Sequence, residues 1–139
     1  MPPDSNLDVL QRFVDAFNSR DVDLIVADVH QDAELHEWPE APGSQSYRGP
    51  DGLRRALEVW FDAWESMQVE VTDIHEVDDR ILVTLHQPAK GKGSEVEVEI
   101  DSYNVYTFDK GKVTRIELFL NRDDALEAAG PTANMEENR

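Results

Sequence analysis

Cysteine is absent from the 139-residue sequence. This absence excludes a disulfide framework, a thiolate nucleophile and a zinc site with cysteine ligands. The four histidines are scattered along the chain and show no ligand spacing such as HExxH, so we expect neither a metal nor another cofactor. No apolar run approaches the ~20 residues of a membrane span, and the segment MPPDSNLD lacks the features of a signal peptide. We therefore expect a soluble, cytoplasmic protein.

Basic residues are few, since 13 Lys and Arg stand against 30 Asp and Glu, and the formal net charge is −17. Such a charge repels the phosphate backbone that dominates affinity for nucleic acids. Nucleic acids and anionic membranes are therefore not expected as partners. The acids are spread along the whole chain, which favours a solvated surface over a separate acidic tail.

Helical spacing of apolar residues dominates the first half of the chain. A helix over residues 6–18 is predicted behind Asp4-Ser5, two residue types that cap helix N-termini. A second, short helix follows Asp21, and a third begins at Gly49-Pro50, because proline fits the first helical turn. Between the last two we expect a strand over 33–38 and then a loop, PEAPGSQSYRG, that is rich in turn residues.

From residue 68 onward the apolar residues recur with a period of two, which is typical of strands. A short helix, DDALEAA, then ends at Gly130, and residues 131–139 are expected to form a frayed tail. Turn residues divide the strand region into four segments, near 68–77, 80–88, 94–108 and 112–120.

This order of elements predicts one α+β domain over residues 1–139, with an ordered core of about 6–130. Three helices from the N-terminal half would cover a curved, mainly antiparallel sheet, and a short C-terminal helix would follow the last strand. A strongly bent sheet covered by helices forms a cone-shaped barrel with a central hollow. Such hollows are natural sites for small molecules.

Acidic and apolar residues alternate in EVEVEI, residues 95–100, so the acids are expected to face solvent and the apolar residues the interior. Asn104 then becomes a polar amide among apolar neighbours. It either satisfies backbone groups or contacts a ligand. If the register holds, the inner face continues with Ser102, Asn104, Tyr106 and Phe108.

The stretch AELHEW, residues 33–38, carries more ionisable groups than a buried strand normally tolerates. A carboxylate held in an apolar hollow would have the raised pKa that suits a general base, whereas one at the strand end would simply reach water. Alternation permits two inward sets: Ala33, Leu35 and Glu37, or Glu34, His36 and Trp38. Periodicity does not choose between them.

Three stretches of the sequence carry a family resemblance: QRFVDAFNSRDVDLIVADVHQDAELHEWPE, YRGPDGLRRAL and NVYTFDKGKVTRIELFLNRDDALEAAG. They resemble the SnoaL-like and ketosteroid-isomerase-like branch of the nuclear-transport-factor-two-like superfamily over residues 6–130. The resemblance implies a cone-shaped α+β barrel. It specifies an activity poorly, because the same fold serves many functions.

The resemblance also implies roles for individual residues. The catalytic aspartate of the ketosteroid isomerases, which moves a proton next to a carbonyl, matches Glu37, and their protonated oxyanion-donor aspartate matches Asn104. Their oxyanion tyrosine matches Phe13, which has no hydroxyl, so a true steroid isomerase is not expected. The match to Glu37 favours Ala33, Leu35 and Glu37 as the inward set. The residues implied to line the pocket are Phe13, Phe17, Trp60, Tyr106, Leu118 and Leu120.

Two functions follow from this reading. One is a cofactor-independent isomerase or cyclase, in which Glu37 abstracts a proton next to a carbonyl of a small apolar substrate and Asn104 polarises the oxygen. The other is a non-catalytic module that binds an apolar ligand or dimerises. A homodimer is expected because Tyr103, Val105 and Phe119 form an apolar patch on the predicted outer face of the sheet.

Overall fold

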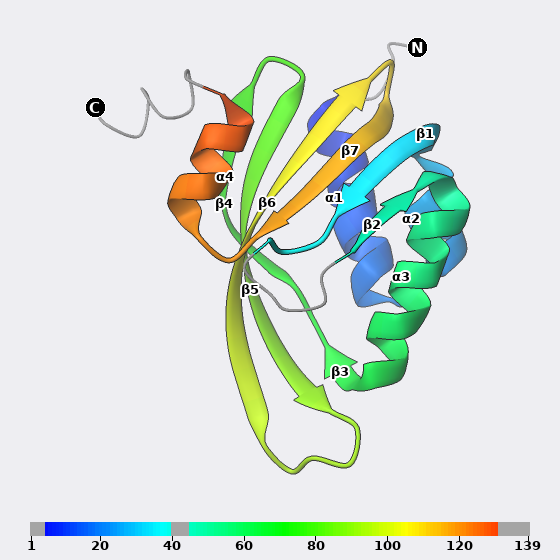
Figure 1. The fold of residues 1–139 in the computed structure, drawn as a ribbon, viewed down its shortest axis with the longest axis vertical. Coiled ribbons are helices and arrows are strands. Elements are labelled where there is room, and N and C mark those ends of the chain that lie inside the picture. Colours follow the sequence, from blue (N-terminus) through cyan, green and yellow to red (C-terminus); the bar gives the residue numbers. More distant parts are fainter. Residues whose placement is uncertain (1–4, 40–44, 131–139) are drawn as a thin grey trace.

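The computed structural model describes residues 5–39 and 45–130; the predicted tail over 131–139 lies outside them. The elements are α1 (Asn6–Asn18), α2 (Val22–Ala27), β1 (Val29–His36), β2 (Ser46–Arg48), α3 (Gly49–Ala63), β3 (Trp64–Met67), β4 (Glu70–Val77), β5 (Arg80–Gly91), β6 (Glu97–Asp109), β7 (Lys112–Phe119) and α4 (Arg122–Ala129). The seven strands form one curved sheet in the order β2-β1-β7-β6-β5-β3, and β4 pairs with β5 outside this path. Helices α1 to α3 lie on one side of the sheet and α4 on the other (Figure 1). The predicted α+β fold is confirmed.

Local signals in the sequence fix where the helices begin. The Ser5 hydroxyl accepts a hydrogen bond from the Asp8 backbone N–H at 3.1 Å, and the Asp8 carboxylate accepts one from the Ser5 backbone N–H at 3.3 Å. This reciprocal pair is a capping box. Asp21 caps α2 by accepting from the Leu24 backbone N–H at 3.2 Å, and Pro50 lies in the first turn of α3. None of the helices in the described part of the chain is long and apolar enough to cross a membrane.

Strand boundaries differ from the prediction where they depend on partners far away in the sequence. β1 begins at Val29, before the predicted residue 33, because it pairs in parallel with β7 and places Val29 opposite Val113. β2 lies within the stretch predicted as a loop and pairs with the end of β1. β3 begins at Trp64, before the strand region predicted from residue 68 onward, and it pairs with the far end of β5.

The larger apolar core lies between helices α1 to α3 and the concave face of the sheet. Val9 of α1, Ile25 of α2 and Leu57 of α3 meet Val83 of β5 there, and each is at most 1% exposed. The β5–β6 ladder shows no register shift over its length. The inner face of β6 therefore continues as predicted through Ser102, Asn104, Tyr106 and Phe108, all of which are buried.

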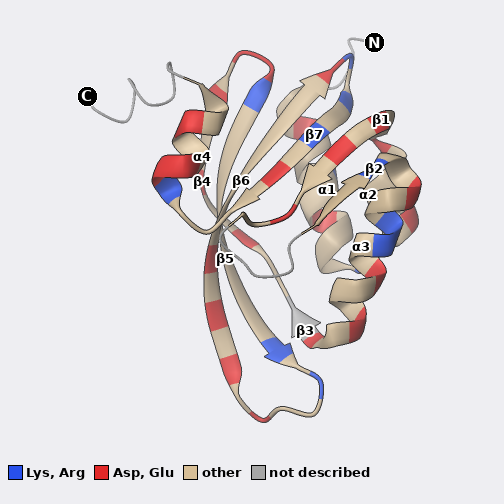
Figure 2. Ribbon diagram, viewed as in Figure 1, with Lys and Arg blue, Asp and Glu red and all other residues tan. Residues whose placement is uncertain are grey.

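The β5–β6 hairpin extends past the helices that cover the sheet (Figure 1). Val96 and Val98, which alternation had placed in the interior, are 67% and 40% exposed, so that part of the prediction is wrong. The physical reason is that the described helices cover the opposite end of the sheet. Acidic residues recur along this part of β6 (Figure 2), and Glu97, Glu99 and Asp101 are exposed to solvent as expected.

The outer face of the sheet corrects the reason given for a homodimer. Val105 is 0% exposed because it packs with Leu82 and with Leu126 of α4. Tyr103 and Phe119 pack against the same cluster. The apolar patch that was expected to meet a second copy is therefore covered by the chain's own C-terminal helix. The homodimer stays a prediction, without this patch as its basis.

Candidate small-molecule site

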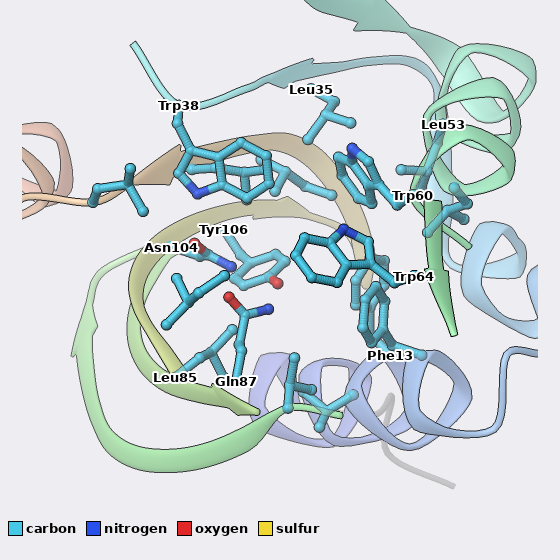
Figure 3. A pocket seen from close by; sticks show the side chains of 18 residues that line it. Phe13, Leu35, Trp38, Leu53, Trp60, Trp64, Leu85, Gln87, Asn104 and Tyr106 are labelled. Atoms are coloured by element: carbon cyan, nitrogen blue, oxygen red, sulfur yellow. The ribbon is translucent and has the colours of Figure 1, made fainter. Parts of the chain in front are cut away.

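A cavity lies between the concave face of the sheet and helices α1 and α3 (Figure 3). Its volume is about 400 Å³, which falls in the range of small-molecule sites. Its wall is completed by strands β5, β6 and β7 and by the segment that follows β1. The cavity is lined by Phe13, Val14, Phe17, Leu35, Trp38, Leu53, Leu57, Trp60, Trp64, Val69, Leu85, Gln87, Ile100, Asn104, Tyr106, Ile116, Leu118 and Leu120.

The cavity wall is aromatic and uncharged. None of the described residues that line it is Asp, Glu, Lys, Arg or His. The rings of Phe13 and Tyr106 meet edge to face with centroids 5.6 Å apart, and those of Trp38 and Trp60 lie 5.8 Å apart. A flat apolar molecule would contact these rings on several sides. An ion would lose its hydration there without meeting an opposite charge.

A group of polar side chains interrupts this apolar wall. Trp38 Nε1 donates a hydrogen bond to Ser102 Oγ at 3.4 Å, and Ser102 Oγ donates one to Asn104 Oδ1 at 2.7 Å. Gln87 and Tyr106 lie nearby and are 9% and 4% exposed. Burial raises the pKa of Tyr106 to about 12, and a hydrogen bond from Asn104 has a smaller effect that lowers it. The Tyr106 hydroxyl therefore keeps its proton at neutral pH.

Most residues selected from the sequence lie at this cavity. Those that line it are Phe13, Phe17, Trp60, Asn104, Tyr106, Leu118 and Leu120. Sequence reasoning did not select Trp64 and Gln87, among others, and it placed Trp38 in the inward set that the resemblance did not favour. Gln87 could have been found, because it shares the strand parity of the buried residues Val83 and Leu85 on β5.

Glu37 lies beside the cavity and does not line it. Its Oε2 accepts a hydrogen bond from Trp60 Nε1 at 2.9 Å, and its Oε1 accepts one from the Gln45 backbone N–H at 3.0 Å. Its own backbone N–H donates to the Gln45 carbonyl at 3.1 Å. The carboxylate thus holds the indole of Trp60, and this indole does line the cavity.

The end of β1 explains the position of Glu37. Ala33 and Leu35 are buried in the inner core, as the resemblance implied. The strand stops at His36, so alternation no longer governs the next residues, and Trp38 enters the cavity wall instead. Glu37 borders a second hollow of about 350 Å³, lined also by Arg115 and Glu117 among others. Glu37 and Asn104 therefore line different hollows in this structure.

The curved sheet, its helical cover and the cavity define the cone-shaped α+β fold that ketosteroid-isomerase-like proteins share. A protein of that fold from Catenulispora acidiphila, in complex with trimethylamine, matches with a TM-score of 0.74 at 10% identity, over 91% of this chain and 95% of that one. TerC, co-crystallised with polyporic acid, matches with a TM-score of 0.74 at 22% identity, over 88% of this chain and 95% of TerC. A protein described as a SnoaL-like polyketide cyclase, from Jannaschia sp. CCS1, matches with a TM-score of 0.73 at 16% identity, over 89% and 90% of the two chains. At these identities the likeness shows the fold alone.

The family follows from the sequence match. The SnoaL-like domain profile covers residues 10–116, which is well over half of the chain, and the protein belongs to the SnoaL-like domain family. This finding confirms the resemblance identified from the sequence. No curated protein matches the chain.

Proposed function

We propose that the protein binds a small, uncharged, mainly apolar molecule in the cavity. The observation that carries the proposal is the composition of the wall, which is almost entirely aromatic and aliphatic and has no charged side chain among its described residues. Burial of apolar surface supplies the driving force for such binding, and a few polar groups fix the orientation. An ionised ligand would be rejected because the wall offers no counter-charge.

Proteins of the same fold support the small-molecule part of this proposal by analogy. TerC was crystallised with polyporic acid and the Catenulispora acidiphila protein with trimethylamine, and both molecules are small. The argument for this chain rests on its own cavity, since the identities are low. The chemical class of ligand follows from the wall and not from the neighbours.

The proposal is tested with N-phenyl-1-naphthylamine, an uncharged probe whose fluorescence rises in apolar surroundings. The wild-type protein should bind it saturably. Leu85→Phe should weaken this binding at least about tenfold, because the larger ring extends into the cavity where Leu85 lines it. Stability should be unchanged or higher, because the added ring fills open space.

Leu82→Phe is the matched control, because Leu82 lies on the same strand but faces the outer cluster under α4. Overpacking there should cost about 1–3 kcal/mol of unfolding free energy while probe binding persists. If the wild-type protein does not bind the probe, or if Leu85→Phe binds it as tightly as the wild type, the cavity is not the binding site.

Proton transfer is a second candidate function, favoured by the hydrogen bond that joins the Glu37 carboxylate to the cavity-lining Trp60. A carboxylate this close to an apolar cavity is placed to act as a base if its side chain turns toward the ligand. The reaction would be an isomerase- or cyclase-type step in which Glu37 takes a proton next to a carbonyl and Asn104 polarises the oxygen. Such a step needs no cofactor.

Hydrogen–deuterium exchange next to the carbonyl of 1-tetralone, followed by NMR, tests this second function. The wild-type protein should accelerate the exchange, Glu37→Gln should abolish the acceleration, and Asn104→Leu should reduce it less. Glu34→Gln is the control, because Glu34 is exposed and its carboxylate contacts His36. Equal acceleration by wild type and Glu37→Gln, or none by the wild type, would exclude Glu37 as a base for such ketones.

A further inference from the structure

Gln87 places a polar amide in the apolar wall of the cavity. It lies on β5, is 9% exposed and lines the cavity. Its side-chain amide makes no hydrogen bond within the described part of the chain. The amide nitrogen and oxygen are not fully buried, so they are accessible from the cavity that Gln87 lines. Buried amides in proteins are normally paired, because an unpaired one forfeits its hydration. Figure 3 shows this amide directed into the cavity, on the same side as Asn104 and Tyr106.

The hydrogen bonds behind Asn104 fix which way its amide faces. The indole N–H of Trp38 can only donate, so Ser102 Oγ accepts from it and uses its single proton toward Asn104 Oδ1. A second, longer contact of Ser102 Oγ, to the Phe119 carbonyl at 3.4 Å, competes only weakly with the 2.7 Å bond to Asn104. Asn104 therefore turns its NH₂ group toward the Tyr106 hydroxyl and the cavity.

The Tyr106 hydroxyl supplies a second donor. Its proton stays in place at neutral pH, because burial raises its pKa to about 12. Its ring packs edge to face against Phe13, which lines the same cavity.

We propose that Gln87 and Tyr106, together with Asn104, form a hydrogen-bonding subsite that binds the carbonyl oxygen of an uncharged ring compound. The apolar rings of the ligand would pack against Phe13, Trp38 and Trp60. Gln87 is then a specificity-determining residue, since it distinguishes an oxygenated ring compound from the bare hydrocarbon. This inference rests on the proposed binding function and names the class of ligand.

Two molecules with the same ring skeleton test the subsite: 1-tetralone, which carries a ketone, and tetralin, which does not. Each competes with N-phenyl-1-naphthylamine for the full-length protein, and the ratio of the two dissociation constants is measured. The wild type should prefer 1-tetralone by on the order of tenfold. Gln87→Leu and Tyr106→Phe should each reduce this preference several-fold and leave tetralin binding unchanged or tighter.

Gln11→Leu is the control, because Gln11 is exposed on α1 and bonds to Asp15 away from the cavity. It should preserve the preference. Thermal unfolding checks the fold, and Gln87→Leu should not lower stability, because the amide makes no hydrogen bond within the described part of the chain that the substitution would break. If the wild type binds the probe but does not prefer 1-tetralone, or if Gln87→Leu and Tyr106→Phe keep the preference, the subsite is refuted while the cavity stands. If the wild type does not bind the probe at all, both proposals fail.

Discussion

Replacing Glu37 by glutamine should destabilise the protein, although it removes a negative charge from an acidic chain. Both carboxylate oxygens accept hydrogen bonds, one from Trp60 Nε1 at 2.9 Å and one from the Gln45 backbone N–H at 3.0 Å. A glutamine has one acceptor oxygen, so its NH₂ group must oppose one of these two donors. A hydrogen bond to a charged group contributes about 1.5–3 kcal/mol. Because Glu37 is partly exposed, we expect Glu37→Gln to cost about 1–2 kcal/mol of unfolding free energy.

A double-mutant cycle with Trp60→Phe isolates the effect. Removal of the indole N–H leaves one donor, which the remaining amide oxygen can satisfy, so Glu37→Gln should cost less than about 0.5 kcal/mol in that background. The coupling is therefore about 1 kcal/mol. Urea unfolding followed by circular dichroism measures it, and Glu58→Gln on the exposed side of α3 is the control, with an expected change within about 0.5 kcal/mol. If the losses of unfolding free energy caused by Glu37→Gln and Trp60→Phe are simply additive, the two groups are not coupled and the reasoning is wrong.

Three further predictions concern the outer surface of the molecule. His86 donates hydrogen bonds to Asp101 at 3.0 Å and to Glu99 at 3.2 Å, with Glu70 opposite it on β4, and these hydrogen bonds raise its pKa. The stabilisation that this pairing gives is complete below pH ~6.5 and is lost as the pH rises through the raised pKa of His86. His86→Gln should therefore flatten the pH dependence of the unfolding midpoint in that range. A pKa of His86 at or below ~6.5, measured by NMR titration, would contradict this prediction. Leu126→Ala should lower the free energy of unfolding by about 2–4 kcal/mol without changing probe binding, because Leu126 is 4% exposed and packs α4 against the outer face of the sheet. A loss below ~1 kcal/mol in urea unfolding would show that α4 contributes little to stability. If the protein forms a homodimer, the affinity of the dimer should rise with salt concentration, because each chain carries a charge of −17 that salt screens. A solution mass measurement that finds only monomer at roughly tens of micromolar protein in moderate salt would exclude the homodimer.

The sequence was sufficient for features that depend on neighbouring residues. The capping box at Ser5, the Asp21 cap and Pro50 in the first turn of α3 fixed the helix starts, because each signal acts within a few residues. The inner face of β6 also followed from alternation, which places Asn104 and Tyr106 in the cavity wall.

Features that depend on distant partners could not be derived in this way. The parallel pairing of β1 with β7 and the short strand β3 arise from contacts across the sheet. The end of β1 at His36 also decides that Trp38, and not Glu37, enters the cavity, and alternation alone carries no information about where a strand stops. The cover that α4 provides for Val105 likewise depends on tertiary packing, so the exposed outer patch was predicted wrongly.

A crystal structure of the protein soaked with 1-tetralone tests the central claim most directly. The account predicts the ring of the ketone inside the cavity, in contact with Phe13 and Trp60, and its oxygen within hydrogen-bonding distance of Gln87, Asn104 or Tyr106. The soak uses a concentration of 1-tetralone that saturates the protein in solution. Binding of the ketone only at the surface, or only in the second hollow beside Glu37, would contradict the proposed site.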